Sequence, residues 1–314
     1  MSGKNKMMIF LSCVVLVSVI ILSVMPRPGI GKITGQDKKI AVIYVEGAIS
    51  SRRSPENFLS DASGGTSDWI QQLHKATEDP NIGAVVLRIN SPGGSSTAAE
   101  EFGEEIKKSR AQGKIIVTSM GDIAASAGYW LAAGTNKIYA NSSTLTGSIG
   151  VYMPYSNWEE LYKKIGIHQE KIKSGAHKDI LANDRPMTEE ERVILQTIVN
   201  EIYDDFVNQV ATGRNMEPSA VRQLADGRIY TGKQALKVGL VDEIGNLQDA
   251  ITGAAALANI QGKPVIEEMG HDNPFSAIFS SHAQLSVIKE IFRVGSVDGE
   301  NVVPLLLPER WRDL

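Results

Sequence analysis

The stretch that decides the fold is residues 83–111, GAVVLRINSPGGSSTAAEEFGEEIKKSRA. It begins with an apolar run rich in strand-forming residues, which predicts a strand. The turn NSPGG follows at 90–94, and residues 97–111 then show the pattern of a helix. A strand that leads through a short turn into a helix is typical of the crossover unit of an α/β domain.

The same alternation continues on both sides of this unit. Its predicted elements are strands at 40–49, 114–120 and 137–140 and a helix at 67–79. Ser67 is expected to cap that helix, and a long helix is predicted to open with the capping box Thr188 to Glu191. The apolar stripe of the long helix is expected to serve packing and consists of Leu195, Val199, Ile202 and Phe206.

The turn NSPGG places Gly93 and Gly94 between a strand and a helix. Glycines tolerate unusual backbone angles and obstruct nothing, so the N–H groups of such a turn can face an oxyanion or a phosphate. The same residue types also favour an ordinary tight turn. No GxGxxG or Walker pattern accompanies the turn, which argues against a nucleotide.

A serine among small residues stands between a predicted strand end and a predicted helix start, Ser126 in AASAGYWLAAG (124–134). Its hydroxyl could cap the helix, or it could be a nucleophile, because a helix N-terminus favours developing negative charge. Ser148 competes for the second role, since a glycine follows each serine two residues later. Neither completes a GxSxG elbow. Ser126 has the better setting, whereas Ser148 more easily satisfies backbone groups in a turn.

A nucleophilic serine needs a base within hydrogen-bond reach. The downstream candidates are His168, His177, Lys171, Lys173 and Lys178. A lysine can serve where burial lowers its pKa well below the usual value of about 10.4, because desolvation disfavours the ammonium form. These residues alone do not select one base.

The N-terminus contains a run of 19 uncharged residues, 7–25, after Lys4 and Lys6. As a helix it would span about 28 Å, close to the thickness of a bilayer core. No small-residue cleavage site closes the run, so we expect an uncleaved transmembrane anchor. The tail 1–6 is expected in the cytoplasm and the catalytic body outside it, after a polar linker at 26–39.

The bulk composition excludes several classes of function. The chain has 314 residues, 42% of them hydrophobic and 22% charged, with a net charge of −4, which suits a globular domain without a basic surface for nucleic acid. The single cysteine, Cys13, forms no intramolecular disulfide, and the histidines and cysteine lack the spacing of zinc ligands. We expect no metal and no cofactor.

Five motifs in order resemble the signal peptide peptidase A family, in its short single-domain bacterial form. They are RINSPGG (88–94), SMGDIAASAGYW (119–130), LTGSIGV (145–151), IKSGAHKDI (172–180) and ADGRIYTGKQALKVGLVDEIG (225–245). The resemblance implies a Clp/crotonase-like α/β fold of repeated β-β-α units, with the peptidase domain at 40–260. Residues 261–314 lie outside the best resemblance and receive no role.

The resemblance also implies roles for individual residues. Ser126 would be the nucleophile and Lys178 the general base of a serine/lysine dyad. The backbone N–H groups of Gly94 and Ala127 would form the oxyanion hole, and Ser148 would have a structural or supporting place. The family implies a membrane-anchored peptidase that degrades signal peptides left after secretion, in a ring-like homo-oligomer whose neighbouring subunit supplies Lys178.

Two other functions remain open from the residues. The same fold also serves crotonase-like acyl-CoA enzymes, which pair glycine-rich turns with an enolate or oxyanion, and binding of coenzyme A would distinguish them. A membrane scaffold that kept the fold without activity is the third possibility. The predicted anchor and the serine/lysine pair argue against the acyl-CoA enzyme, and the intact Ser126 and Lys178 argue against the inactive scaffold.

Overall fold

The computed structural model describes residues 38–51 and 65–270. Several predicted segments lie wholly or mostly outside these ranges: the tail 1–6, the anchor 7–25, the linker 26–39 and the extension 261–314. Among the helices in the described part of the chain, none is long and apolar enough to cross a membrane. The domain bounds stay predictions.

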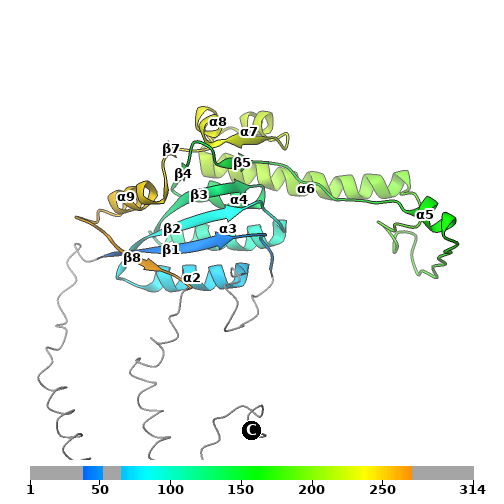
Figure 1. Ribbon diagram of the computed structural model, residues 1–314, viewed down its shortest axis with the longest axis horizontal. Helices are drawn as coiled ribbons and strands as arrows, with labels where there is room; N and C mark the ends of the chain where they lie inside the picture. Colours follow the sequence, from blue (N-terminus) through cyan, green and yellow to red (C-terminus); the bar gives the residue numbers. More distant parts are fainter. Residues whose placement is uncertain (1–37, 52–64, 271–314) are drawn as a thin grey trace, which may run out of the picture. The chain divides into compact units, whose positions relative to one another are not determined.

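A largely parallel sheet forms the centre of the fold (Figure 1). Its described strands are β1 (Lys39–Glu46), β2 (Ile82–Ser91), β3 (Ile115–Ala125), β4 (Lys137–Ala140), β5 (Leu145–Gly147), β6 (Ile229–Thr231), β7 (Glu243–Ile244) and β8 (Val265–Glu268). The order is β6-β5-β3-β2-β1-β8, with β4 between β3 and β7. The first half of β3 pairs with β4 and its last residues pair with β5, both in parallel, whereas β5 and β6 are antiparallel.

Helices cover both faces of this sheet. The described helices are α2 (Thr66–Glu78), α3 (Ser96–Ala111), α4 (Ala127–Ala133), α5 (Glu159–Lys164), α6 (Glu189–Arg214), α7 (Pro218–Leu224), α8 (Gly232–Lys237) and α9 (Leu247–Leu257). In Figure 1, α9 lies on one side of β1 to β3, and α2 and α3 lie on the other. The sheet is therefore the middle layer of three.

The alternation of side chains along β1 explains why these layers form. Ile40 and Val42 pack in one apolar cluster with Ile251 of α9. Ala41 and Ile43, which alternate with them along the strand, are also fully buried, on the opposite face. A parallel strand that is covered on both faces is expected to carry a continuous apolar run, as β1 does from Ile40 to Ile43.

The predicted α/β class and the predicted strands and helices are confirmed, with bounds that differ by a few residues. Ser67 as the N-cap of α2 is wrong. Gly65 takes that position, because its N–H donates to the Asp68 carboxylate at 3.1 Å and the Thr66 hydroxyl donates to the Ser50 carbonyl at 2.9 Å. β3 continues to Ala125, beyond its predicted end at 120, and delivers the chain directly to Ser126.

The capping box of α6 is confirmed. The Thr188 hydroxyl accepts a hydrogen bond from the Glu191 N–H at 3.2 Å, and the Glu191 carboxylate accepts one from the Thr188 N–H at 2.9 Å. α6 has 26 residues, which corresponds to about 39 Å of helix. Phe206 and Val210, in its C-terminal half, are buried against the body of the fold.

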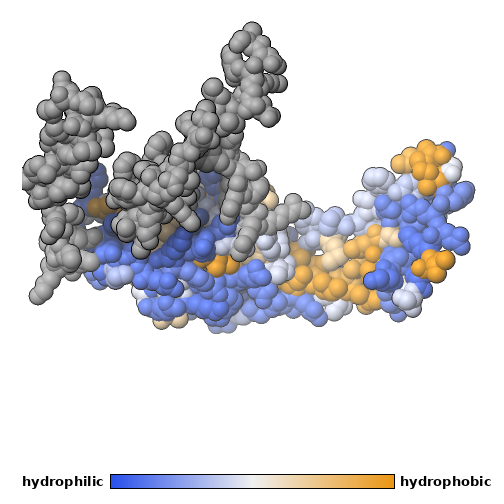
Figure 2. All heavy atoms as spheres, turned by 90° about the horizontal axis from the view of Figure 1, so that it is seen from below, coloured by the Kyte–Doolittle hydropathy of each residue, from blue (hydrophilic) through white to orange (hydrophobic). Residues whose placement is uncertain are grey.

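The N-terminal half of α6 extends beyond the sheet, together with α5 and the segments that flank it (Figure 1). We call residues 151–205 the arm. Large apolar side chains of the arm are exposed at Tyr152, Met153, Trp158, Leu161, Ile165, Ile167, Ile172, Leu181, Val193 and Ile198. Figure 2 shows apolar surface gathered along part of the arm and at its tip. Of the predicted packing stripe, only Phe206 is buried, because the described residues supply no further layer over the N-terminal half of α6.

Candidate active site

The turn from β3 into α4 holds Ser126 in an unusual backbone conformation, with φ 54° and ψ −124°. Residues with a Cβ rarely adopt such angles, which cost on the order of 1–3 kcal/mol and cluster at functional sites. Ser126 occupies the N-cap position of α4, but its hydroxyl makes no capping hydrogen bond. The capping interpretation is therefore wrong, and the hydroxyl is available for other chemistry.

Backbone hydrogen bonds from both sides maintain this conformation. The Ser126 N–H donates to the Gly147 carbonyl at 2.9 Å, which ties it to the end of β5. Its carbonyl accepts from the N–H groups of Tyr129 and Trp130 at 2.8 and 2.9 Å. Every residue of α4 is buried. The serine therefore stands on a rigid support, as a positioned nucleophile requires.

The NSPGG turn after β2 packs directly against Ser126. A Cβ at Gly93 would lie 2.7 Å from the Ser126 Cβ, and a Cβ at Gly94 would lie 2.1 Å from the Ile49 carbonyl oxygen. Gly94 also has φ 156°, at the edge of the range that favours glycine. The turn can come this close to the serine because neither residue has a side chain.

The same turn leaves a backbone donor beside the serine. Gly94 forms a parallel bridge with Ile49, in which Ile49 donates to the Gly93 carbonyl at 3.0 Å and Ser95 donates to the Ile49 carbonyl at 2.9 Å. This bridge does not use the N–H of Gly94. Ala127 is the first residue of α4, so its N–H lies among those that the helix itself cannot satisfy. The assignment of these two groups as an oxyanion hole stays a prediction.

Ser126 borders a cavity of about 290 Å³. Its apolar lining comes from Ala99 of α3, Trp130 of α4, and Val199, Ile202 and Phe206 of α6. The rings of Trp130 and Phe206 lie 5.1 Å apart between centroids, at an angle of 42°. A cavity of this composition suits an apolar side chain of a bound peptide. The sequence argument missed Val199 and Ile202 as cavity residues, because a helical stripe does not show what lies opposite it.

Ser148 shares a second hollow with Ser126. It has φ 49°, and its N–H donates to the Arg228 carbonyl at 2.8 Å. Asp226 borders the same hollow and is ion-paired with Arg228, whose hydrogen bonds lower the Asp226 pKa to about 2. This carboxylate is therefore ionised and already partnered, which makes it a poor base for Ser126.

The predicted bases lie elsewhere. Lys178 is exposed on the arm, between α5 and α6. Neither hollow that Ser126 borders is lined by Lys178, His177 or His168. In the described part of one chain, the predicted nucleophile, the glycine turn and the apolar cavity thus lie together, and the predicted base does not border either hollow.

The arm distinguishes among the candidate bases. Lys171 is ion-paired with Asp184, and Lys173 with Asp179 at 2.6 Å. The Nε2 of His177 lies 3.5 Å from the Glu190 carboxylate. Within the described ranges, Lys178 makes no such ion pair. Of the three candidate lysines, it is therefore the one whose amine is not held in an ion pair with a described residue.

Comparisons with known proteins place the chain among the proteases. The family model described as peptidase family S49 matches residues 108–261. The chain therefore belongs to peptidase family S49, of the signal peptide peptidase A type, and the resemblance inferred from the five motifs is confirmed.

Three relatives show the extent of this similarity. A Synechocystis protein that bears a protease name is 42% identical, over 72% of this chain and 77% of that protein. An Enterococcus faecium protein named for signal peptide peptidase A is 38% identical, over 77% and 70%. A Methanocaldococcus jannaschii protein that bears a protease name is 34% identical, over 83% and 84%. The similarity thus covers most of each protein.

Proposed function

We propose that this protein is a membrane-anchored serine endopeptidase that degrades remnant signal peptides and other short hydrophobic peptides. We also propose that its sheet and helices form a Clp/crotonase-type fold. The observation that carries the proposal is the strained Ser126, which makes no capping bond and borders an apolar cavity. The protease names of its relatives support peptides as substrates.

In the proposed mechanism, the Ser126 hydroxyl oxygen attacks the scissile carbonyl carbon while the neutral amine of Lys178 takes the hydroxyl proton. The carbonyl oxygen gains negative charge and accepts hydrogen bonds from the N–H groups of Gly94 and Ala127. The lysine ammonium then gives its proton to the leaving amine, and the acyl-enzyme forms. Water, deprotonated by the same amine, releases the second product.

We propose that Ser126 of one copy meets Lys178 of another in a homo-oligomer. Within one chain Lys178 does not border the hollows beside Ser126. The exposed apolar side chains of the arm are of the kind that oligomer interfaces bury. Burial in such an interface would also remove water from the lysine, which favours its neutral form.

Mutagenesis of the dyad tests this proposal. Ser126→Ala and Lys178→Met are each expected to reduce hydrolysis of a signal-peptide substrate by about 10³-fold or more, whereas Ser148→Ala retains part of the activity. Wild-type activity should rise with pH, because only the neutral amine accepts a proton. Thermal melts verify that each variant folds. Normal turnover by folded Ser126→Ala would contradict the proposal and would favour an enzyme with another nucleophile, whereas a wild type without any hydrolysis would favour the inactive scaffold.

Mixing the two inactive variants tests whether the dyad spans two chains. Co-expression of Ser126→Ala with Lys178→Met places an intact serine beside an intact lysine in some interfaces. Activity should therefore return in the mixed oligomer. A mixture that assembles but stays inactive would assign the dyad to a single chain.

We propose that the body of the protein lies outside the cytoplasm, held by a single-pass anchor at residues 7–25. The uncharged run and its signal-like flanks support this orientation. Protease added to intact cells stripped of their outer layers should digest the body. Protection of the body until the membrane is opened would reverse the orientation.

Coenzyme A binding distinguishes the second candidate function, a crotonase-like acyl-CoA enzyme. Membership of a peptidase family favours peptide hydrolysis over it. We therefore expect no displacement of peptide substrate by acyl-CoA.

A further inference from the structure

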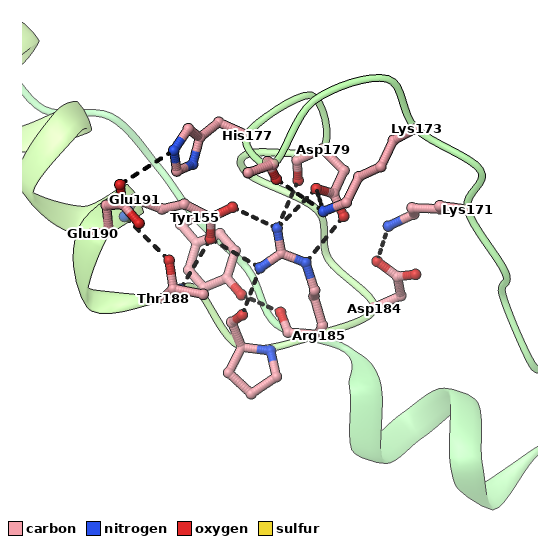
Figure 3. Close-up of polar contacts among 12 residues, drawn as sticks. Tyr155, Lys171, Lys173, His177, Asp179, Asp184, Arg185, Thr188, Glu190 and Glu191 are labelled. Carbon is pink, nitrogen blue, oxygen red and sulfur yellow. Dashed lines mark hydrogen bonds and ion pairs between the residues drawn. The ribbon is translucent and has the colours of Figure 1, made fainter.

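The segment that carries Lys178 contains no helix or strand between the end of α5 at Lys164 and the start of α6 at Glu189. Most of its backbone hydrogen bonds close short turns, such as Lys178 N–H to the Gly175 carbonyl at 3.2 Å and Ala182 N–H to the Asp179 carbonyl at 2.9 Å. Its conformation must therefore come largely from side chains. Figure 3 shows a compact group of charged residues at this place.

Arg185 is the centre of that group. Its Nε and Nη2 donate to the two carboxylate oxygens of Asp179, each at 3.0 Å. Its Nη1 and Nη2 donate to the two carboxylate oxygens of Glu191, at 2.9 and 2.5 Å. One planar guanidinium thus holds two carboxylates by paired hydrogen bonds, a geometry that lysine cannot reproduce.

Both partners of Arg185 are themselves fixed. Glu191 is 2% exposed and closes the capping box of α6 through the Thr188 N–H. Asp179 also accepts from Lys173 at 2.6 Å, and Lys173 donates to the Ala176 carbonyl at 2.9 Å. Arg185 therefore connects the rigid first turn of α6 to the turn at 176–179.

The backbone of Arg185 has its own anchor. Its carbonyl accepts a hydrogen bond at 2.5 Å from the hydroxyl of Tyr155, which lies in the extended segment before α5. The Trp158 N–H donates to the Asn183 carbonyl at 2.6 Å. These two hydrogen bonds join the segment before α5 to the segment before α6, close to the Arg185 guanidinium.

We propose that Arg185 is a positioning residue for Lys178. Asp179 follows Lys178 directly in the chain, so the guanidinium that fixes the Asp179 carboxylate also fixes the backbone from which the Lys178 side chain departs. The inference rests on the proposed function, in which the Lys178 amine must reach Ser126 of a second copy. A long lysine side chain reaches a defined point only if its Cα is held, and a displacement of about 1 Å can cost roughly 10²-fold in rate.

The ion pair of Lys171 with Asp184 provides a matched control. This ion pair lies in the same segment as the ion pair of Lys173 with Asp179. The two lysine side chains are similarly exposed, at 33% for Lys171 and 35% for Lys173. In the described part of the chain, Lys171 pairs with Asp184 and forms neither a hydrogen bond nor an ion pair with Asp179, so Lys171→Met removes a charge from the same segment without releasing the residue next to Lys178.

The test is steady-state hydrolysis of a signal-peptide substrate by the full-length oligomer, with kcat and KM measured separately. Arg185→Met is expected to lower kcat by about 10²-fold with KM changed less than about twofold. Arg185→Lys should lower kcat nearly as much, because lysine keeps the positive charge but cannot make the paired hydrogen bonds of the guanidinium. Asp179→Asn should lower kcat as well, whereas Lys171→Met keeps wild-type kcat. Each variant should still unfold cooperatively, at a somewhat lower temperature for Arg185→Met because the buried Glu191 carboxylate loses its partner, and the oligomer mass should be unchanged.

Three results would overturn the inference: wild-type kcat in folded, assembled Arg185→Met, loss of the oligomer in that variant, or an equal loss of kcat in Lys171→Met. Oligomer loss would make Arg185 an assembly residue, and the third result would show a general effect of charge. Lys178→Met separates this failure from that of the proposed function. If Lys178→Met is inactive while Arg185→Met is normal, only the positioning role fails, whereas an active Lys178→Met removes the dyad itself.

Discussion

The sheet and the arm of this protein are stabilised in different ways. In β1 to β3, side chains are buried on both faces of the sheet. Ser126 directly follows β3 and precedes α4, a helix whose residues are all buried. In the arm, charged side chains form the internal contacts while large apolar side chains face outward. The sheet thus buries its apolar side chains within one chain, whereas the described arm leaves many of its own exposed.

This difference separates two requirements of the proposed catalysis. The nucleophile needs a strained and rigid backbone, which dense apolar packing can provide. A base that must dock against a second copy needs an exposed surface, so it cannot be held by a core of its own. Directional ion pairs such as those of Arg185 fix a surface segment without burying it.

The largest expected effect contrasts one core residue with one arm residue. Phe102→Ala removes a fully buried ring that stacks on Trp69 with centroids 6.2 Å apart, and should cost about 3–5 kcal/mol of unfolding free energy. Ile172→Ala alters a side chain that is 102% exposed and should change it by less than about 0.5 kcal/mol. Chemical denaturation measures both. Equal destabilisation would mean that the arm is already packed within one chain.

A smaller effect contrasts two glycines with positive φ. Gly94→Ala brings a Cβ to 2.1 Å from the Ile49 carbonyl, so the turn must move and its N–H is displaced. Loss of one oxyanion donor typically lowers kcat by about 10²–10³-fold. Gly113→Ala is the control, because its φ is 89° and no heavy atom lies within 4 Å of its Cβ. Peptide hydrolysis should fall only in Gly94→Ala, and normal turnover there would exclude this turn from the oxyanion hole.

The smallest expected effect is the loss of stability of the arm at low pH, when Glu191 becomes protonated. Hydrogen bonds from Arg185 lower the Glu191 pKa to about 2, below its usual value of about 4.3. A lowered carboxyl pKa contributes stability that is present above about pH 4.3 and is lost as the pH falls towards about 2. Carboxyl carbon NMR of glutamate-labelled protein should show this titration, and Arg185→Met should return it towards about 4.3. A normal midpoint in the wild type would contradict the network.

The hydrophobic pattern of the chain was enough to predict the α/β class and the strands and helices from β1 to β4, because burial on both faces of a parallel strand leaves a continuous apolar run. The capping box at Thr188 was equally local, since all its hydrogen bonds lie within four residues. Ser126 was preferred to Ser148 by its neighbours, a predicted strand end and a predicted helix start, and its role as nucleophile came from the family resemblance. In each case the deciding interaction lies within a few residues along the chain.

Only the tertiary structure showed which surfaces meet. Val199 and Ile202 are an ordinary helical stripe in the sequence, and they line the cavity beside Ser126 because α6 crosses α4. The Ile49 bridge that shapes the Gly94 turn joins residues 45 positions apart. Lys178 and Arg185 lie in a segment without periodicity, where the sequence offers no register. Their geometry depends on ion pairs between charged groups six residues apart, a spacing that follows no helix or strand period.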